Sequence, residues 1–122
     1  MSPPPGEWLA AFLFTCAIEL PIYAALLGPH FRRKWAPVAL GLFVNLLTHP
    51  ALWYVMPRWS PYGQWLVCAE GGVVAVEALL IAGVLARRLG VARALAWGAG
   101  SSLIANAAST LVGLALQRLD LM

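Results

Sequence analysis

The chain has 122 residues and a formal net charge of +3, and its composition is strongly apolar. Apolar residues make up 61% and charged residues only 11%, whereas roughly 25% of the residues in soluble domains are charged. Five acids and eight bases cannot cover the surface of a soluble fold of this size. A bilayer supplies the missing apolar solvent, so we expect one membrane domain over residues 1–122 and no nucleic-acid partner.

Four apolar stretches follow one another along the chain, separated by short segments that carry proline, glycine or bases. They cover about residues 8–28, 36–56, 62–86 and 94–116. Each reaches the ~20 residues that a helix needs to cross the hydrocarbon core. Because lipid offers the backbone no hydrogen-bond partner, these segments must be helical. The predicted fold class is an all-α integral membrane protein, a compact bundle of four transmembrane helices.

The bases predict how such a bundle is oriented. Six of the eight lie in the first and third breaks, at residues 28–34 and 87–93, whereas the tight hairpin at 57–61 holds only Arg58. Cytoplasmic loops carry an excess of Lys and Arg. We therefore expect both basic loops in the cytoplasm, both termini outside, and a location in the inner (plasma) membrane of a bacterium.

Three of the five acids, Glu19, Glu70 and Glu77, fall within predicted spans, where no Lys or Arg is found. An ionised carboxylate in hydrocarbon costs several kcal/mol, roughly 3 even on the lenient insertion scales. These groups must therefore be protonated, hold a cation or line a wet cavity. Intramembrane acids of this kind indicate a site for protons or cations.

Each predicted helix carries its polar residues on one face. The spacing is i, i+3, i+7 on the first helix, i, i+4 on the second, i, i+7 on the third and i, i+4, i+7, i+8 on the fourth. The packing that keeps all four polar stripes away from lipid turns them toward a shared axis inside the bundle. The stripes comprise Cys16, Glu19 and Tyr23; Asn45 and His49 with Thr48 beside them; Glu70 and Glu77; and Ser102, Asn106, Ser109 and Thr110.

Depth along the helices ranks these residues. A rise of 1.5 Å per residue places Glu19, Asn45 and Asn106 at ~15–16 Å from the outer ends, near the midplane. We expect Glu19 to be the functional centre, with the Tyr23 hydroxyl as a hydrogen-bond partner for its carboxylate. The outer layer is expected to hold His49, Glu70 and Ser109, and the inner layer Tyr23, Glu77 and Ser102.

Small residues and prolines predict local packing. Ser101, Ala105, Ser109 and Gly113 follow one another at i, i+4 spacing on the last helix, and Gly71, Gly72 and Ala75 are expected to play a similar part on the third. Small residues let helix backbones approach closely in lipid. Pro21 and Pro50 are expected to kink their helices beside Glu19 and His49 and to free backbone carbonyls there.

The two halves also resemble each other. Glu19, Asn45 and Thr48 in the first half match Glu77, Asn106 and Ser109 in the second, and an Arg-Arg pair lies between the glutamate and the asparagine in each half. The pattern is that of two parallel helix-pair repeats related by an axis along the membrane normal. The competing interpretation is a chance similarity between two segments that are rich in the same few apolar residues.

In size, helix number and a mid-span glutamate within Ala17-Ile18-Glu19, the chain resembles the small multidrug-resistance transporters. The resemblance covers no further motif, and the strong basic bias departs from the weak bias of dual-topology members. The resemblance is therefore one of size and helix number.

Three functions remain open from the sequence. The first is binding or passage of protons or cations by a homo-oligomer or larger membrane complex. The second is an accessory or assembly subunit whose polar stripes hold helices together. The third is an intramembrane enzyme with a divalent metal on Glu19, His49, Glu70 and Glu77, although no spaced ligand pair such as HExxH is present. The sequence decides neither between a divalent metal and a monovalent cation nor whether either is bound.

Overall fold

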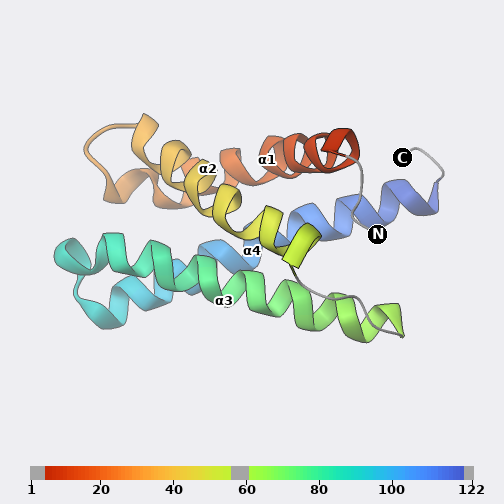
Figure 1. The fold of residues 1–122 in the computed structure, drawn as a ribbon. Helices are drawn as coiled ribbons and strands as arrows, with labels where there is room; N and C mark the ends of the chain where they lie inside the picture. Colours follow the sequence, from red (N-terminus) through yellow and green to blue (C-terminus); the bar gives the residue numbers. More distant parts are fainter. Residues whose placement is uncertain (1–4, 56–60, 120–122) are drawn as a thin grey trace.

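The computed structural model describes residues 5–55 and 61–119, without the side chains of residues 5, 53, 55, 62 and 117. Helices dominate this part of the chain (Figure 1). The predicted hairpin at 57–61 lies outside the described residues except for Pro61. The elements are α1 (Pro5–Leu27), a 3-10 turn η1 (Gly28–His30), α2 (Trp35–Pro50), a π-helical turn η2 (Ala51–Val55), α3 (Tyr62–Leu89) and α4 (Val91–Arg118).

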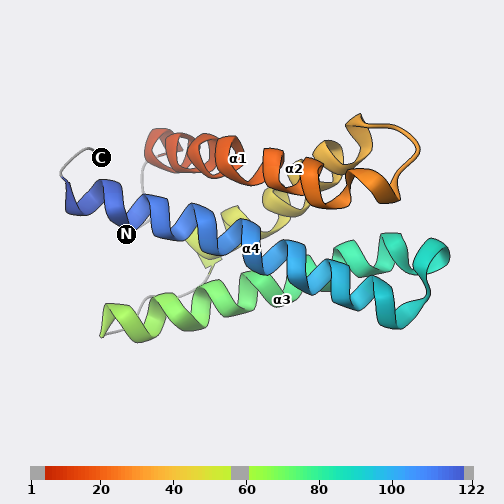
Figure 2. The same cartoon turned by 180° about the vertical axis from the view of Figure 1, so that it is seen from behind.

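The helices form two antiparallel hairpins, α1 with α2 and α3 with α4, which lie against each other (Figures 1 and 2). α3 and α4 share the most extensive packing, and α4 also packs along α1. α2 and α3 touch much less. The α1–α2 and α3–α4 connections lie at one end of the bundle, and the first turn of α1 and the last turn of α4 lie at the other.

Three segments are long and apolar enough to cross a membrane, namely Gly6–His30, Gly63–Leu89 and Val91–Leu116. The expected fourth span, at 36–56, is not among them within the described residues. α2 has only 16 residues and ends at Pro50, where the chain continues as a π-helical turn. Proline cannot donate the backbone hydrogen bond that would continue a regular helix, which accounts for the change of helical form.

The α3–α4 connection is far shorter than the break predicted at residues 87–93. α3 continues to Leu89 and α4 begins at Val91, so that Gly90 alone turns the chain. Its φ of 81° lies in the region that glycine adopts without a steric penalty. The Gly90 N–H donates to the Ala86 carbonyl at 2.9 Å and satisfies one carbonyl at the end of α3.

α3 and α4 approach each other closely at Gly98. A Cβ atom added there would lie 2.5 Å from the Ala78 carbonyl oxygen. The small residues of α4 that follow one another at i, i+4 spacing are largely buried, as expected, at Ser101, Ala105 and Ser109. Gly71, Gly72 and Ala75 of α3 are exposed, so they take no part in the packing among the described helices of this chain. Helical periodicity could not show that α3 turns Ala78 and Ala82, rather than its glycines, toward α4.

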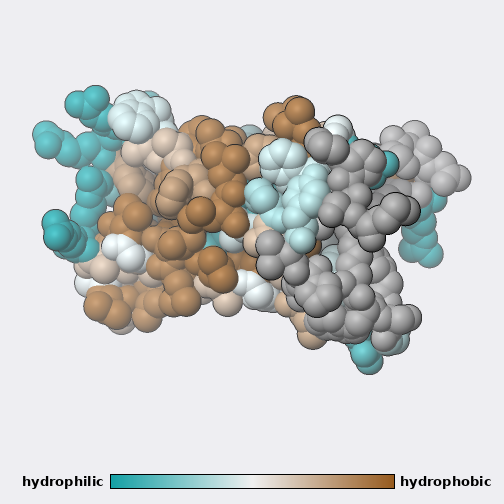
Figure 3. Space-filling view, viewed as in Figure 1, coloured by the Kyte–Doolittle hydropathy of each residue, from teal (hydrophilic) through white to brown (hydrophobic). Residues whose placement is uncertain are grey.

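Polar and apolar side chains are arranged opposite to the pattern of a soluble bundle. Large apolar residues such as Leu13, Val67 and Leu111 are more than half exposed, whereas Glu19 and Glu77 are fully buried. Figure 3 shows a broad apolar surface beside hydrophilic side chains at the end where the connections lie. An apolar core closes the interior near that end, formed around Tyr23, Leu27, Val44, Ile81 and Leu85.

Candidate functional site: a buried carboxyl pair beside a polar cavity

The polar stripes of the four helices meet inside the bundle. Glu19, Asn45, Glu77, Ser102 and Asn106 are each at most 4% exposed, and together they come from α1, α2, α3 and α4. The inward orientation predicted from helical spacing is therefore what the structure has. Because Lys and Arg occur only near the helix ends and connections, no basic side chain belongs to this cluster.

Glu77 lies at the centre of the hydrogen-bond network. Its Oε1 accepts from the Tyr23 hydroxyl at 2.9 Å and from the Asn106 amide at 2.7 Å, and its Oε2 accepts from the Thr48 hydroxyl at 2.8 Å. The donors come from α1, α2 and α4, so one carboxyl of α3 joins all the other helices. Such complete pairing is what a polar group needs where water is absent.

Glu19 has fewer hydrogen-bond partners than Glu77, and different residues surround it. Its Oε2 accepts from the Ser109 hydroxyl of α4 at 2.5 Å. The Asn45 amide, oriented so that both of its ends are satisfied, donates to Glu19 Oε1 at 3.1 Å and to Glu77 Oε2 at 3.0 Å. One amide nitrogen therefore bridges the two buried carboxyls.

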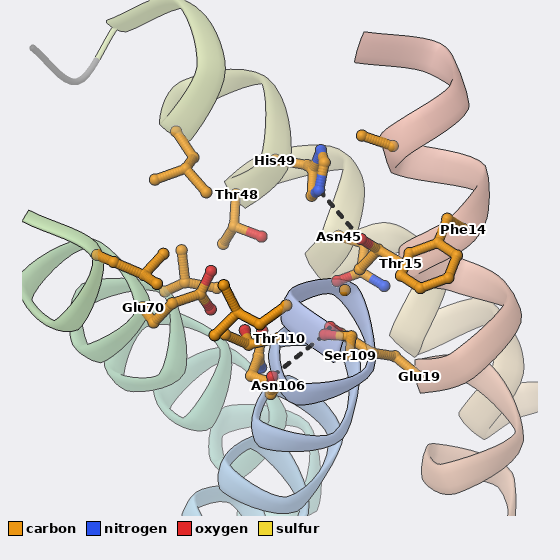
Figure 4. A pocket seen from close by; sticks show the side chains of 16 residues that line it. Phe14, Thr15, Glu19, Asn45, Thr48, His49, Glu70, Asn106, Ser109 and Thr110 are labelled. Atoms are coloured by element: carbon orange, nitrogen blue, oxygen red, sulfur yellow. Dashed lines mark hydrogen bonds between the residues drawn. The ribbon is translucent and has the colours of Figure 1, made fainter. Parts of the chain in front are cut away.

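A cavity of about 160 Å³ lies next to Glu19, toward the end of the bundle that holds the first turn of α1 (Figure 4). Asn45, Asn106 and Ser109 line it beside Glu19. All four helices contribute to its wall, and Glu77 is not part of it. The cavity therefore distinguishes the two buried carboxyls, because it reaches Glu19 only.

Two further titratable groups line this cavity. Glu70 is half-buried and has Thr110 as a hydrogen-bond partner. His49 lies with Nε2 3.3 Å from the Thr15 hydroxyl and with its ring edge against Phe12, at a centroid distance of 5.7 Å. Figure 4 shows Glu70 and His49 on separate walls of the cavity.

Two details of the predicted site are wrong. Tyr23 donates to Glu77 and not to Glu19. Asn106, expected in the midplane layer with Glu19, bonds to Glu77, which was assigned to the inner layer. Ser102, expected in the inner layer with Tyr23 and Glu77, donates to the Val74 carbonyl at 3.0 Å and so fixes α4 to α3. The predicted depths were too coarse because the helices cross at angles and α2 changes form after Pro50.

The proposed metal ligands do not gather. Among the described residues, no three His, Cys, Asp or Glu side chains are placed to hold a metal ion. Glu77 is directed toward its three donors, and His49 is directed toward Thr15.

Sequence reasoning missed Thr15 as part of the site. Thr15 precedes Glu19 by four residues and therefore shares its helix face, a spacing that would have identified it. Its hydroxyl lines the cavity and contacts His49.

Comparison with known proteins adds no further information about the site. No family model matches the chain, and no curated protein or solved structure shows significant similarity to it.

Proposed function

We propose that this chain is an integral membrane protein whose α2 region completes a fourth span, with both basic loops in the cytoplasm and both termini outside. The exposed apolar surface, the buried polar interior and the three long apolar helices support this proposal. The placement of both connections at one end of the bundle also supports it, because that end carries six of the eight bases. We propose the bacterial inner (plasma) membrane as its location.

We further propose that the protein binds a proton or a small monovalent cation at Glu19. One observation carries this proposal: the Glu19 carboxyl is 1% exposed and yet lines a polar cavity. A carboxylate at such a depth needs a positive charge, and no Lys or Arg is among the described residues that line the cavity. The oxygen-bearing side chains of Asn45, Asn106, Ser109 and Thr110 around the cavity suit a hard cation or a hydrated proton.

Passage across the membrane would need more than one chain. The cavity lies at one end of the bundle, and the apolar core around Tyr23, Leu27, Ile81 and Leu85 fills the other. We propose that copies assemble, or join a larger membrane complex, through lipid-facing helix surfaces. The exposed small residues Gly71, Gly72 and Ala75 of α3 would allow close helix contact between chains.

Glu77 favours the second candidate function, in which the polar residues serve as interhelical contacts in an accessory subunit. This carboxyl is 0% exposed, is away from the cavity and has donors on three other helices. We propose that Glu77 is a structural group held by these donors and that Glu19 is the group that exchanges its proton. The metal-dependent enzyme is the least supported alternative, since the proposed ligands do not converge in the described part of the chain.

Infrared spectroscopy of the carboxyl C=O stretch in reconstituted protein tests this division. We expect a band that responds to pH between 5 and 9 or to added Na⁺ or K⁺ and that disappears in Glu19→Gln. Glu77→Gln is the matched control, because it also removes a buried carboxyl but should leave the responsive band in place. A Glu19 band that is unchanged by pH and by cations would overturn the binding proposal and leave the accessory subunit.

A further inference from the structure

An apolar hollow lies at the surface of the bundle between α1 and α4. It has a volume of about 270 Å³ and is lined by Leu26 of α1 and by Ala96, Trp97, Gly100, Ser101 and Ile104 of α4. The hydroxyl of Ser101 donates to the Gly98 carbonyl of its own helix at 3.4 Å, so it seeks no partner in the hollow. Trp97 and Ile104 are exposed, so the hollow opens to the outside of the bundle. We call it the α1–α4 groove.

The groove lies beside the end of the bundle that holds the α1–α2 and α3–α4 connections, which we call the connection end (Figure 2). The rings of Trp97 on α4 and His30 in η1 lie with their centroids 4.5 Å apart, which brings the groove wall against the α1–α2 connection. Arg93 comes one turn before Trp97 and three turns before Ile104, so the three residues share one face of α4. The long side chain of Arg93 can therefore keep its guanidinium in water at the mouth of the groove.

The connection end is basic and has no acid to balance it. Six of the eight Lys and Arg residues lie there, and all six are exposed. Arg88 is engaged within the protein, because its Nη1 donates to the His30 carbonyl at 2.7 Å and its guanidinium lies over the Phe31 ring. The acids that come next to the two connections along the sequence, Glu19 and Glu77, are buried inside the bundle. The other exposed bases of this end therefore call for an anionic partner from outside the chain.

We propose that an anionic phospholipid of the cytoplasmic leaflet binds here, with its phosphate at Arg93 and one acyl chain in the α1–α4 groove. The inference rests on the proposed membrane location and orientation and is independent of the proposed cation site. Bases at the membrane surface attract anionic headgroups, and a guanidinium can donate two parallel hydrogen bonds to one phosphate. Because lipid chains are as apolar as the groove, the groove adds van der Waals packing that fixes one chain, and the bases supply the selectivity for charge.

The dimensions of the site fit one leaflet. At 1.5 Å per residue, the helix from Arg93 to Ile104 is roughly 16 Å long, about half of the ~30 Å hydrocarbon core. A headgroup held at Arg93 therefore places an acyl chain along the groove as far as the midplane. An apolar cavity of ~150 Å³ holds one benzene molecule, so the groove, at about 270 Å³, has room for roughly ten carbon atoms. The second acyl chain would stay in the bilayer.

Native mass spectrometry of the full chain in detergent tests the selectivity. The probes are phosphatidylglycerol and phosphatidylcholine with identical acyl chains, together with glycerol phosphate as an anionic headgroup without chains. We expect phosphatidylglycerol to bind at least tenfold more tightly than phosphatidylcholine, because the phosphate of the zwitterionic lipid is balanced by its own choline. Glycerol phosphate should also bind at least tenfold more weakly than phosphatidylglycerol, because it has no chain to occupy the groove.

Photolabelling of the unaltered chain tests the position. The probe is phosphatidylglycerol with a diazirine midway along one acyl chain, in nanodiscs of phosphatidylcholine. We expect label on the peptides that contain Leu26 and residues 96–104. Label spread evenly over the lipid-facing helix surfaces would overturn the proposal. This measurement needs no substitution, so it holds even where a variant fails to fold.

Two matched pairs of variants separate the bases from the groove. Arg93→Gln should weaken phosphatidylglycerol binding at least fivefold, whereas Arg118→Gln, which removes a charge from the other end of α4, should leave it unchanged. A Cβ added at Gly100 or at Gly83 meets no atom within 4 Å, so both positions accept a larger side chain. Gly100 lines the α1–α4 groove, whereas Gly83 lines a separate hollow between α3 and α4. Gly100→Phe should weaken binding at least fivefold, and Gly83→Phe should not.

The outcomes distinguish this inference from the membrane proposal on which it rests. Equal affinity for the two phospholipids, or equal effects within either pair of variants, overturns the lipid site. Binding of glycerol phosphate as tight as that of phosphatidylglycerol overturns the part played by the groove. In each of these cases a chain that inserts into nanodiscs keeps its proposed membrane location. A chain that does not insert into nanodiscs overturns both proposals.

Discussion

Ser109 on α4 donates a 2.5 Å hydrogen bond to Glu19 on α1, so the last helix fixes the carboxyl of the first. The reciprocal contact is present, because Thr48 on α2 donates to Glu77 on α3 at 2.8 Å. In each case the hydroxyl of one hairpin reaches the carboxyl of the other. Such an exchange is the pattern that a two-fold axis between the hairpins would produce.

The amides support the same relationship. Asn45 donates to Glu19 within the first hairpin, and Asn106 donates to Glu77 within the second, although Asn45 also donates to Glu77 across the hairpins. These contacts favour the internal repeat suggested by the sequence. The match fails at Tyr23, because Ile81 stands at the corresponding position of α3 and offers Glu19 no hydroxyl. That difference leaves Glu19 with fewer donors than Glu77.

The exchanged hydroxyls yield a paired prediction. Ser109→Ala should shift the infrared C=O band of Glu19 and leave that of Glu77 in place, and Thr48→Val should do the reverse. Each change removes one hydrogen bond to a carboxyl and should lower stability by about 1–2 kcal/mol. Infrared spectra and thermal unfolding in detergent check both effects. If either variant moves both bands equally, the carboxyls form one coupled unit, and the assignment of one hydroxyl to each carboxyl is wrong.

Among Glu19, Glu70 and Glu77, Glu77 should be the acid on which stability depends most. Glu77→Leu removes an acceptor from the buried donors of Tyr23, Thr48 and Asn106. Thr48 keeps the Val44 carbonyl and Asn106 keeps the Ser102 carbonyl as acceptors, so the main cost, about 1–3 kcal/mol, falls on the Tyr23 hydroxyl. Glu77→Gln keeps an acceptor and should be far milder. We expect the unfolding midpoint to fall strongly in the Leu variant, measured by circular dichroism in detergent.

Lysine substitutions extend this test. Glu77→Lys would bury a cation beside three donors and should impair folding or insertion. Glu70→Lys should be milder, since Glu70 is half-buried and lines the cavity. Unchanged expression and melting in both variants would mean that the polar face of α3 lies against water or headgroups.

Close packing of α3 against α4 gives a prediction that is independent of the acids. Gly98→Ala places a methyl group 2.5 Å from the Ala78 carbonyl oxygen, so the helices must move apart. Overpacking of this kind costs about 1–3 kcal/mol. Gly100→Ala is the matched control on the same helix, because an added Cβ there meets no atom within 4 Å. Comparable melting temperatures for the two variants would argue against the close contact at Gly98.

The sequence predicted helices and helix faces well because both depend on local periodicity. The inward orientation of Glu19, Asn45 and Asn106 follows from hydropathy and spacing alone. Which carboxyl receives which donor was not predictable, because that depends on how the helices pair and cross. The assignment of Tyr23 to Glu19 was wrong for this reason.

Packing and cavities were less accessible to sequence reasoning. Small residues mark surfaces that can approach a neighbour, but they do not say which neighbour is used. On α4 the small face meets α3 at Gly98, whereas on α3 Gly71 and Gly72 remain exposed. A hollow between α2 and α3 lies beside the point where α2 continues as a π-helical turn after Pro50, and periodicity carries no signal for a hollow of this kind.

The orientation in the membrane is the last prediction. Reporter fusions after Lys34 and after Arg88 should both read as cytoplasmic, because these positions lie in the two basic segments. The structure places the α1–α2 and α3–α4 connections at the same end, so the two reporters must agree whatever the orientation.

The charges decide which orientation is adopted. Arg32, Arg33, Lys34, Arg87, Arg88 and Arg93 lie at the connection end, against Arg58 and Arg118 elsewhere in the chain. Replacing the three bases at 32–34 by Gln should weaken the bias and yield a mixed readout at both fusion sites. Replacing Arg118 by Gln is the control and should not reverse the readout, because it removes a charge from the opposite end. A periplasmic readout at both sites would invert the proposed topology and open the polar cavity toward the cytoplasm, and opposite readouts at the two sites would contradict the bundle itself.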